Sequence, residues 1–225
     1  MRLEELSVTS HGAQLFSAAL SPNDLDHLKT ALADEAKDRA GVRLYGSAQL
    51  RPFLDHSGPV GRIAASVLGP ACLPVRAIFF DKTAEANWSV AWHQDRTIAV
   101  EQRMHVSGFG PWSVKSGMVH VEPPFELLAR MVTLRVHLDR VPEINAPLLI
   151  APASHNRGRI PESSVLELVE QCGVVQCLAE AGDVWMYSTP ILHASDAAVE
   201  PKHRRVLQVD YALGQLPGGL HWLGV

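Results

Sequence analysis

Most of the chain after Pro70 consists of short segments rich in β-branched and aromatic residues, separated by Gly, Pro and Asn. Such segments predict strands, because branched and aromatic side chains fit a pleated backbone and turn residues end it. We predict strands at residues 75–80, 88–92, 131–138, 148–150, 174–178, 184–187, 191–194 and 205–211. Many short strands at close spacing, following N-terminal helices, indicate a mainly β fold, either a barrel or a sandwich, with supporting helices.

The N-terminal part, residues 20–70, favours helices. Ser21 can cap a helix and Pro22 suits its first position. Apolar residues then recur at helical spacing, and we expect this helix to end near residues 39–41. Two shorter helices are predicted at residues 61–68 and 162–171.

Length and composition limit the class of protein. The chain has 225 residues and no internal repeat or clear linker, so we expect one domain over residues 1–225. Its formal net charge of −4 gives no indication of a basic surface that would bind nucleic acid. The sequence also contains no run of eighteen apolar residues, the length that a membrane-spanning helix needs. The N-terminus lacks the apolar core of a secretory signal, and three sparse cysteines argue for a reducing compartment, so we expect a cytoplasmic protein.

Residues 101–125 stand out between the predicted strands. They hold few periodic apolar positions and many Gly, Pro and Ser residues, so we interpret them as a long excursion. Long loops inside compact domains are usually functional. We expect this segment to face a substrate, with Trp112, Lys115, Met118 and His120 as candidate contacts.

A His-x-acid motif occurs three times, at His93–Asp95, His120–Glu122 and His137–Asp139, and chance alone gives about one in a chain of this composition. Residues two apart in an extended chain project to the same face, so His93 and Asp95 at a strand end can bind one ion while Gln94 points away. A distant His193 on a short apolar strand could complete the set. Two histidines and one carboxylate are the ligands of non-haem Fe(II) oxygenases.

Three ordered segments strengthen this choice. They are Trp92-His93-Gln94-Asp95, residues 145–155 (Asn-Ala-Pro-Leu-Leu-Ile-Ala-Pro-Ala-Ser-His), and the stretch from Gly182 through His193 to Arg204-Arg205. In order and separation they resemble the phytanoyl-CoA dioxygenase family of Fe(II)- and 2-oxoglutarate-dependent oxygenases, over about residues 75–213. Two alanines in the second segment, Ala146 and Ala153, stand where the family usually has glycines.

The resemblance implies a double-stranded β-helix, a jelly-roll or cupin-like barrel, with its core at about residues 75–213. It implies that His93, Asp95 and His193 are the iron ligands. It also implies that Arg204 binds the distal carboxylate of 2-oxoglutarate and that Ser195 assists Arg204 in this binding. Arg205 is the alternative to Arg204. Arg135 takes a strand position that is often aromatic in relatives, so it either contacts cosubstrate or substrate or faces outward.

The activity that the resemblance implies is a hydroxylation of a C–H bond in a small molecule, using Fe(II), 2-oxoglutarate and dioxygen and releasing succinate and carbon dioxide. The presence of Asp95 argues against halogenation, since related halogenases have a small residue there. Two alternatives stay open: a cupin-type metalloenzyme that does not use 2-oxoglutarate, and a non-catalytic binding barrel. The sequence identifies neither the substrate nor the oligomeric state.

Overall fold

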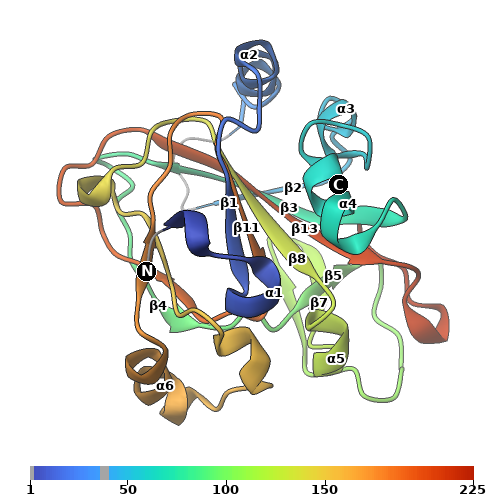
Figure 1. The fold of residues 1–225 in the computed structure, drawn as a ribbon. Helices are drawn as coiled ribbons and strands as arrows, with labels where there is room; N and C mark the ends of the chain where they lie inside the picture. The colour runs from blue at the N-terminus through green and yellow to red at the C-terminus, as the bar shows by residue number, and fades with distance from the viewer. Residues whose placement is uncertain (1–2, 36–40) are drawn as a thin grey trace.

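The computed structural model describes residues 3–35 and 41–225, and antiparallel strands dominate it (Figure 1). The strands are β1 (Ala13–Phe16), β2 (Val42–Leu44), β3 (Cys72–Lys82), β4 (Val90–His93), β5 (Ile98–Val100), β6 (Trp112–Lys115), β7 (Met118–Val121), β8 (Val132–His137), β9 (Leu148–Ile150), β10 (Val175–Cys177), β11 (Val184–Ser188), β12 (His193–Ser195) and β13 (Arg204–Leu213). The helices are α1 (Val8–His11), α2 (Pro22–Ala31), α3 (Arg51–Leu54), α4 (Gly61–Leu68), α5 (Phe125–Leu128) and α6 (Val165–Cys172). Short 3₁₀ turns lie at Leu3–Glu5, Glu143–Asn145, Ser154–Arg157, Glu162–Ser164 and Pro217–Gly219.

The strands form three sheets. The largest has the order β1-β11-β8-β13-β3-β2, the second has the order β10-β9-β12-β4, and the third, β5-β7-β6, is small. Neighbours in the large sheet are far apart in sequence, and β3 and β13 pair along almost their whole length, from Cys72↔Leu213 to Lys82↔Arg204. This mainly β architecture with few helices confirms the predicted fold class.

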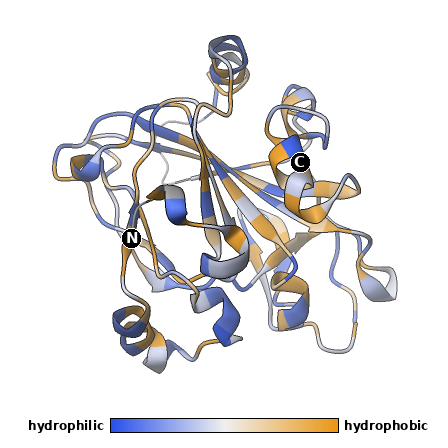
Figure 2. Cartoon of the chain, viewed as in Figure 1, coloured by the Kyte–Doolittle hydropathy of each residue, from blue (hydrophilic) through white to orange (hydrophobic). Residues whose placement is uncertain are grey.

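The two faces of the large sheet differ in character. One face packs its apolar side chains, such as Ala77, Leu134 and Leu207, against the N-terminal helices α2, α3 and α4. Because side chains alternate along a strand, the opposite face carries the residues in between. On β3 these are Arg76, Ile78, Phe80 and Lys82, and on β8 they are Thr133, Arg135 and His137. The alternation is visible along the strands in Figure 2. The polar face of the sheet is therefore available to line a site.

Most predicted elements are found close to their expected positions. The strand predicted at 148–150 and the helix predicted at 61–68 have the expected bounds, and the other predicted strands are offset by a few residues. Ser21 caps α2 as predicted, accepting a hydrogen bond from the backbone N–H of Asp24 at 3.1 Å. The helix is shorter than expected, however, since it ends at Ala31 and passes into tighter turns through residue 35. Its predicted end near residues 39–41 falls largely outside the described residues.

The interpretation of residues 101–125 as an excursion without strands was wrong. Strands β6 and β7 form a hairpin there, and β7 also pairs with β5. The two residues of the turn, Ser116 and Gly117, both have positive φ, of 52° and 77°, which is the conformation that tight two-residue hairpins need. The signal in the sequence was the Ser-Gly pair between two short valine-containing segments. None of the helices in residues 3–35 and 41–225 has the length and apolar character needed to cross a bilayer.

Candidate metal and cosubstrate site

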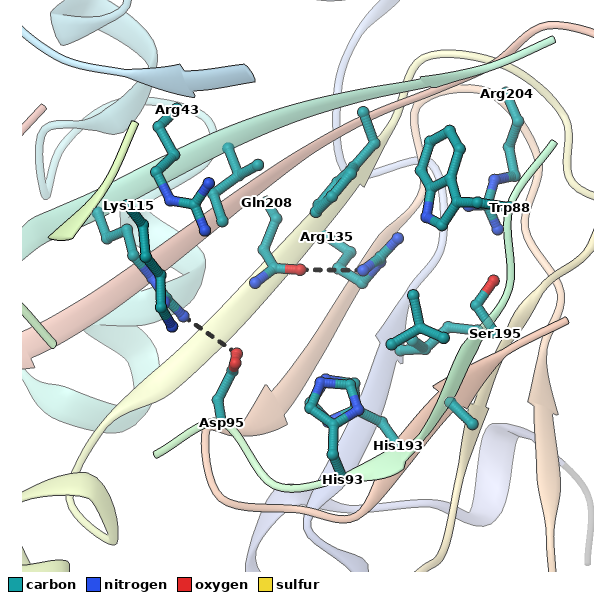
Figure 3. Close-up of a pocket in the computed structure, with 16 residues that line it drawn as sticks. Arg43, Trp88, His93, Asp95, Lys115, Arg135, His193, Ser195, Arg204 and Gln208 are labelled. Atoms are coloured by element: carbon teal, nitrogen blue, oxygen red, sulfur yellow. Dashed lines mark hydrogen bonds and ion pairs between the residues drawn. The ribbon is translucent and has the colours of Figure 1, made fainter. Parts of the chain in front are cut away.

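His93, Asp95 and His193 meet at the edge of the second sheet. His93 ends β4 and His193 begins β12, and the two residues are paired across these antiparallel strands. Their ring centroids are 4.3 Å apart, and Asp95 follows two residues after His93. One possible ligand atom from each of the three residues lies within 4.8 Å of the others, and Figure 3 shows the side chains converging on the same space. The structure thus brings together residues a hundred positions apart in the sequence.

Backbone carbonyls set the orientation of both imidazole rings. The Nδ1 atom of His93 lies 2.8 Å from the carbonyl oxygen of Ala91, and that of His193 lies 2.9 Å from the carbonyl oxygen of Ile191. If each Nδ1 donates to its carbonyl, each Nε2 has a free lone pair, which is the usual arrangement of a metal-binding histidine. Gln94 points away as predicted, because its amide nitrogen donates to the carbonyls of Gly158 and Pro190.

Asp95 is held by Arg76, a residue that no motif in the sequence marks as part of the site. A guanidinium nitrogen of Arg76 donates to Asp95 at 3.0 Å, and its Nε donates to the buried Asp210 at 2.5 Å. Burial alone would raise the pKa of Asp95, but Arg76 and then His193 and His93 outweigh it and lower this pKa to about 2. Burial, with Asp95 adding to it, raises the pKa of Asp210 despite the same arginine, since one guanidinium serves two carboxylates.

The protonation states suit a divalent metal. Burial, followed by the neighbouring His93, lowers the pKa of His193 to about 4, so its imidazole is neutral at pH 7. Asp95 is ionised at the same pH. Two imidazoles and one carboxylate, all contributed from one side, match the donor set of a non-haem iron centre with open positions opposite.

A cavity of about 150 Å³ opens over the triad (Figure 3). It lies between the polar face of the large sheet and the strands β4 and β12. Five of the residues around it are cationic, and Asp95 is the carboxylate among them. The described residues that line it are Arg43, Arg76, Ile78, Phe80, Trp88, Val90, His93, Asp95, Lys115, Arg135, Leu148, His193, Ala194, Ser195, Arg204 and Gln208.

Arg204 lies at one end of this cavity and is almost fully buried, with 3% of its surface exposed. One guanidinium nitrogen donates to the carbonyl of Ala146, while Nε has no hydrogen-bond partner among the described residues. Burial, with a smaller contribution from Arg135, lowers the pKa of Arg204 to about 9. A buried cation without a carboxylate beside it is a site prepared for an anion.

Three further residues surround this end. Arg135 donates to Gln208 at 2.9 Å, so its side chain points into the barrel and the outward alternative is wrong. Ser195 accepts a hydrogen bond from the fully buried Lys82 at 3.2 Å. Burial, and then Arg204 and Arg135, lower the pKa of Lys82 to about 7. Lys82 was missed, although it continues the alternation of Arg76, Ile78 and Phe80 beyond the predicted end of the strand.

The structure also separates the alternatives that the sequence left open. Arg205 faces away from the cavity and makes two hydrogen bonds to the carboxylate of Asp139, at 2.9 and 2.7 Å. The carboxylate of Glu122 accepts from Arg159 at 2.6 Å. The acids of the other two His-x-acid motifs are therefore bound to arginines, and Arg204, not Arg205, lines the cavity.

Of the four candidates in the 101–125 segment, Lys115 lines the cavity. His120 is fully buried and lies on the same face of the β6–β7 hairpin as Lys115. Its Nδ1 atom is 3.0 Å from the carbonyl oxygen of Met118. Trp112 packs in an apolar cluster with Arg103 over its ring, and neither it nor Met118 reaches the cavity. Arg43 and Trp88, which were not among the predicted site residues, also line the cavity. No pattern in the sequence around them indicates this position.

Ala146 and Ala153, the two alanines of the segment at residues 145–155, both adopt the left-handed conformation, with φ of 50° and 63°. This is the conformation that glycine adopts without strain. Both turns therefore have a backbone geometry that glycine would adopt more easily than alanine.

A family model matches residues 10–206, and its description is phytanoyl-CoA dioxygenase (PhyH). The match covers most of the chain, including all three triad residues, Ser195 and Arg204. A search of curated protein sequences found no significant match.

Several solved structures share the fold. The apo form of EctD from S. alaskensis is 18% identical, with a TM-score of 0.69, covering 97% of this chain and 78% of that chain. The carbocyclase SnoK from nogalamycin biosynthesis is 18% identical, with a TM-score of 0.66, and the coverage is 100% and 90%. The epimerase SnoN, in complex with Fe3+, alpha ketoglutarate and nogalamycin RO, is 16% identical, with a TM-score of 0.65 and coverage of 94% and 88%. At these identities the similarity establishes the fold and leaves the reaction open.

Proposed function

The chain belongs to the phytanoyl-CoA dioxygenase family, and we propose that it is an Fe(II)- and 2-oxoglutarate-dependent oxygenase that hydroxylates a C–H bond of a small molecule. The observation that carries this proposal is that one cavity contains both the triad of two histidines and one carboxylate and the buried Arg204, which has no carboxylate partner among the described residues. A metal site alone would fit many enzymes. A metal site beside a carboxylate-binding arginine favours 2-oxoglutarate as the cosubstrate.

In this proposal His93, Asp95 and His193 hold the iron, and the two backbone carbonyls keep the histidine rings turned toward it. When bound, Fe(II) and 2-oxoglutarate supply the activation of dioxygen, and the cosubstrate leaves as succinate and carbon dioxide. Arg76 keeps Asp95 ionised and limits its rotation. Because orienting groups of this kind change metal affinity, Arg76 is a positioning residue of the site.

At the other end, Arg204 binds the distal carboxylate of 2-oxoglutarate, and the Ser195 hydroxyl donates a further hydrogen bond to it. Lys82 donates to Ser195 and to the carbonyl of Asp196, at 3.2 and 2.6 Å. The Ser195 hydroxyl donates to the same Asp196 carbonyl at 3.4 Å, and in this proposal it exchanges that long bond for one to the cosubstrate. Arg135 adds a second positive charge near the same end. The barrel walls exclude bulk water and so strengthen these charge interactions.

Hydroxylation is favoured over halogenation because Asp95 fills the ligand position that a halide would need. An alternative reading, a cupin-type metalloenzyme without 2-oxoglutarate, gives Arg204 no carboxylate to bind. A non-catalytic binding role would not require three side chains oriented to bind one metal ion.

The test is an anaerobic titration of the metal-free protein with Fe(II) and then with 2-oxoglutarate, followed by visible absorption. We expect a charge-transfer band that needs both components and is lost in His193→Ala. Oxygen-dependent succinate release with candidate substrates, and a product heavier by one oxygen atom, would then separate hydroxylation from epimerisation and ring closure. A folded protein that binds Fe(II) without the band would instead be a metalloenzyme of another kind, and one that binds no metal would be a binding barrel.

A further inference from the structure

The cavity over the triad carries an excess of positive charge that binding of Fe(II) and 2-oxoglutarate would not neutralise. Among the described residues, its lining holds the cations Arg43, Arg76, Lys115, Arg135 and Arg204 against the single carboxylate of Asp95. Fe(II) and 2-oxoglutarate carry equal and opposite charges, so binding of both leaves this excess unchanged. The positive charge must therefore be accounted for in another way.

Three of the five cations have a partner or an assigned ligand. Arg76 is paired with Asp95 and Asp210, at 3.0 and 2.5 Å. Arg204 and Arg135 lie on the side of the cavity assigned to the cosubstrate (Figure 3). Arg43 and Lys115 remain, and both lie on the opposite side, near Asp95 (Figure 3).

Arg43 reaches the cavity from β2, at the edge of the large sheet. It is paired with Ile78 of β3, which also lines the cavity, so both side chains are on the inner face. Its Nε is buried without a hydrogen-bond partner, and no ion pair joins it to a carboxylate within residues 3–35 and 41–225. Burial and the charge of Arg76 lower the pKa of Arg43. An arginine in this position is stabilised by an anion.

Lys115 reaches the same side from β6, in the small sheet. Its Nζ donates to the hydroxyl of Thr97 at 3.3 Å, a neutral partner that leaves its charge unbalanced. Burial, and then Arg76 and Arg43, lower the pKa of Lys115 and outweigh the carboxylate of Asp95, which acts in the opposite direction. Two like charges from separate segments of the chain thus point into one half-buried space, an arrangement that costs free energy until an anion binds there.

We propose that the substrate carries an oxyanion group, a carboxylate or a phosphate, which Arg43 and Lys115 bind on the Asp95 side of the metal. This inference rests on the proposed function, since it takes Arg204 and Arg135 to be occupied by 2-oxoglutarate. It gives the substrate a direction: the acidic group lies at the Arg43 and Lys115 end, and the bond that reacts lies over the triad. A guanidinium and an ammonium together suit an acidic group better than they suit a neutral or cationic substrate.

The experiment uses the full chain, loaded anaerobically with Fe(II) and saturating 2-oxoglutarate. Three probes of similar length are titrated: hexanoate, butyl phosphate and the neutral hexanamide. Binding is measured by calorimetry and by perturbation of the charge-transfer band. The variants are Arg43→Gln, Lys115→Gln and the double variant, with Arg130→Gln as a matched control that removes an exposed cation outside the cavity.

We expect at least one of the anions to bind more tightly than hexanamide, and each single substitution to weaken that anion by roughly 10- to 100-fold, the range for a hydrogen bond to a charged group. The double variant should lose the preference for anions, and Arg130→Gln should keep it. Whichever anion binds better identifies the group as carboxylate or phosphate.

Equal binding of anions and hexanamide, no binding of either anion, or unchanged anion affinity in the double variant would overturn the proposal. The band formed by Fe(II) and 2-oxoglutarate should be present in all variants, because neither residue contacts the cosubstrate. Its absence in the unmodified protein would instead refute the proposed function. The calorimetric comparison of variants would still decide whether Arg43 and Lys115 bind an anion.

Discussion

Replacing Arg76 by Met should destabilise the metal-free protein strongly and weaken its affinity for Fe(II). Arg76 is 7% exposed and is the shared partner of Asp95 and Asp210. Met has a similar length and fills the same space, so the substitution removes the charge and the hydrogen bonds with little change in packing. Two carboxylates then lose the cation that is hydrogen-bonded to both of them.

The size of the effect follows from the burial of this pair. Removing one partner of a buried ion pair costs about 3–5 kcal/mol, because the other charge is left uncompensated. The lowering of the pKa of Asp95 from 3.8 to about 2 corresponds by itself to about 2 kcal/mol. Since this pKa is lowered on folding, that contribution is complete above about pH 4 and is lost as the pH falls towards 2. A lost orienting bond to a metal ligand typically weakens metal affinity about 10- to 100-fold.

The measurements are urea unfolding of the metal-free protein at pH 7 and a Fe(II) titration. Arg140→Met is the matched control, because its ion pair with Glu180 is exposed and should contribute at most about 1 kcal/mol. The double variant Arg76→Met/Asp210→Asn should recover part of the lost stability, since it removes one of the two unpaired charges. The reasoning is refuted if Arg76→Met loses no more stability than Arg140→Met, or if the losses from Arg76→Met and Asp210→Asn simply add.

Three other predictions concern the cosubstrate, pH and the core. Arg204→Ala should weaken 2-oxoglutarate binding by roughly 10- to 100-fold in the anaerobic titration, whereas Arg205→Ala, which removes an outward ion pair, should leave it nearly unchanged. Burial lowers the pKa of His137 well below 6.5, so the unfolded state binds a proton that the folded state does not. The stability of the protein should therefore fall as the pH drops below about 6.5. In urea unfolding, His137→Leu should make stability less dependent on pH in that range. Leu134→Ala, at a fully buried position, should cost about 2–5 kcal/mol by the same assay, and a similar loss from the exposed Leu166→Ala would contradict the assignment of the core.

Local patterns in the sequence were enough to predict most strands and the triad. Residues 148–150 and 184–187 could be predicted as strands because β-branched and aromatic side chains favour that backbone locally. His93 and Asp95 could be paired because a strand places alternate residues on one face. His193 needed the further pattern that ends in Arg204, since no local rule connects residues a hundred positions apart.

The hairpin at residues 112–121 shows where local patterns failed. Its strands have four residues each and its turn is a plain Ser-Gly pair, so the signal was weak against the surrounding Gly and Pro. The same weakness placed Trp112 and Met118 at the cavity when only Lys115 of that segment lines it. A short strand shows which residues share a face, but its orientation in space depends on its pairing with other strands.

The sequence by itself predicted the mainly β fold and the candidate metal ligands, because both depend on periodicity or on an ordered motif, whereas the choice of Arg204 over Arg205 needed the structure. Only the tertiary structure decided the electrostatics of the cavity. Arg43 comes from β2, Arg76 and Lys82 come from β3, and Lys115 comes from β6, and their roles depend on which of these charges pair with a carboxylate. Coulomb interactions act through space and become strong where burial removes water. The binding of Arg76 to Asp95, and the unbalanced charges of Arg43 and Lys115, therefore become visible only once the strands are packed together.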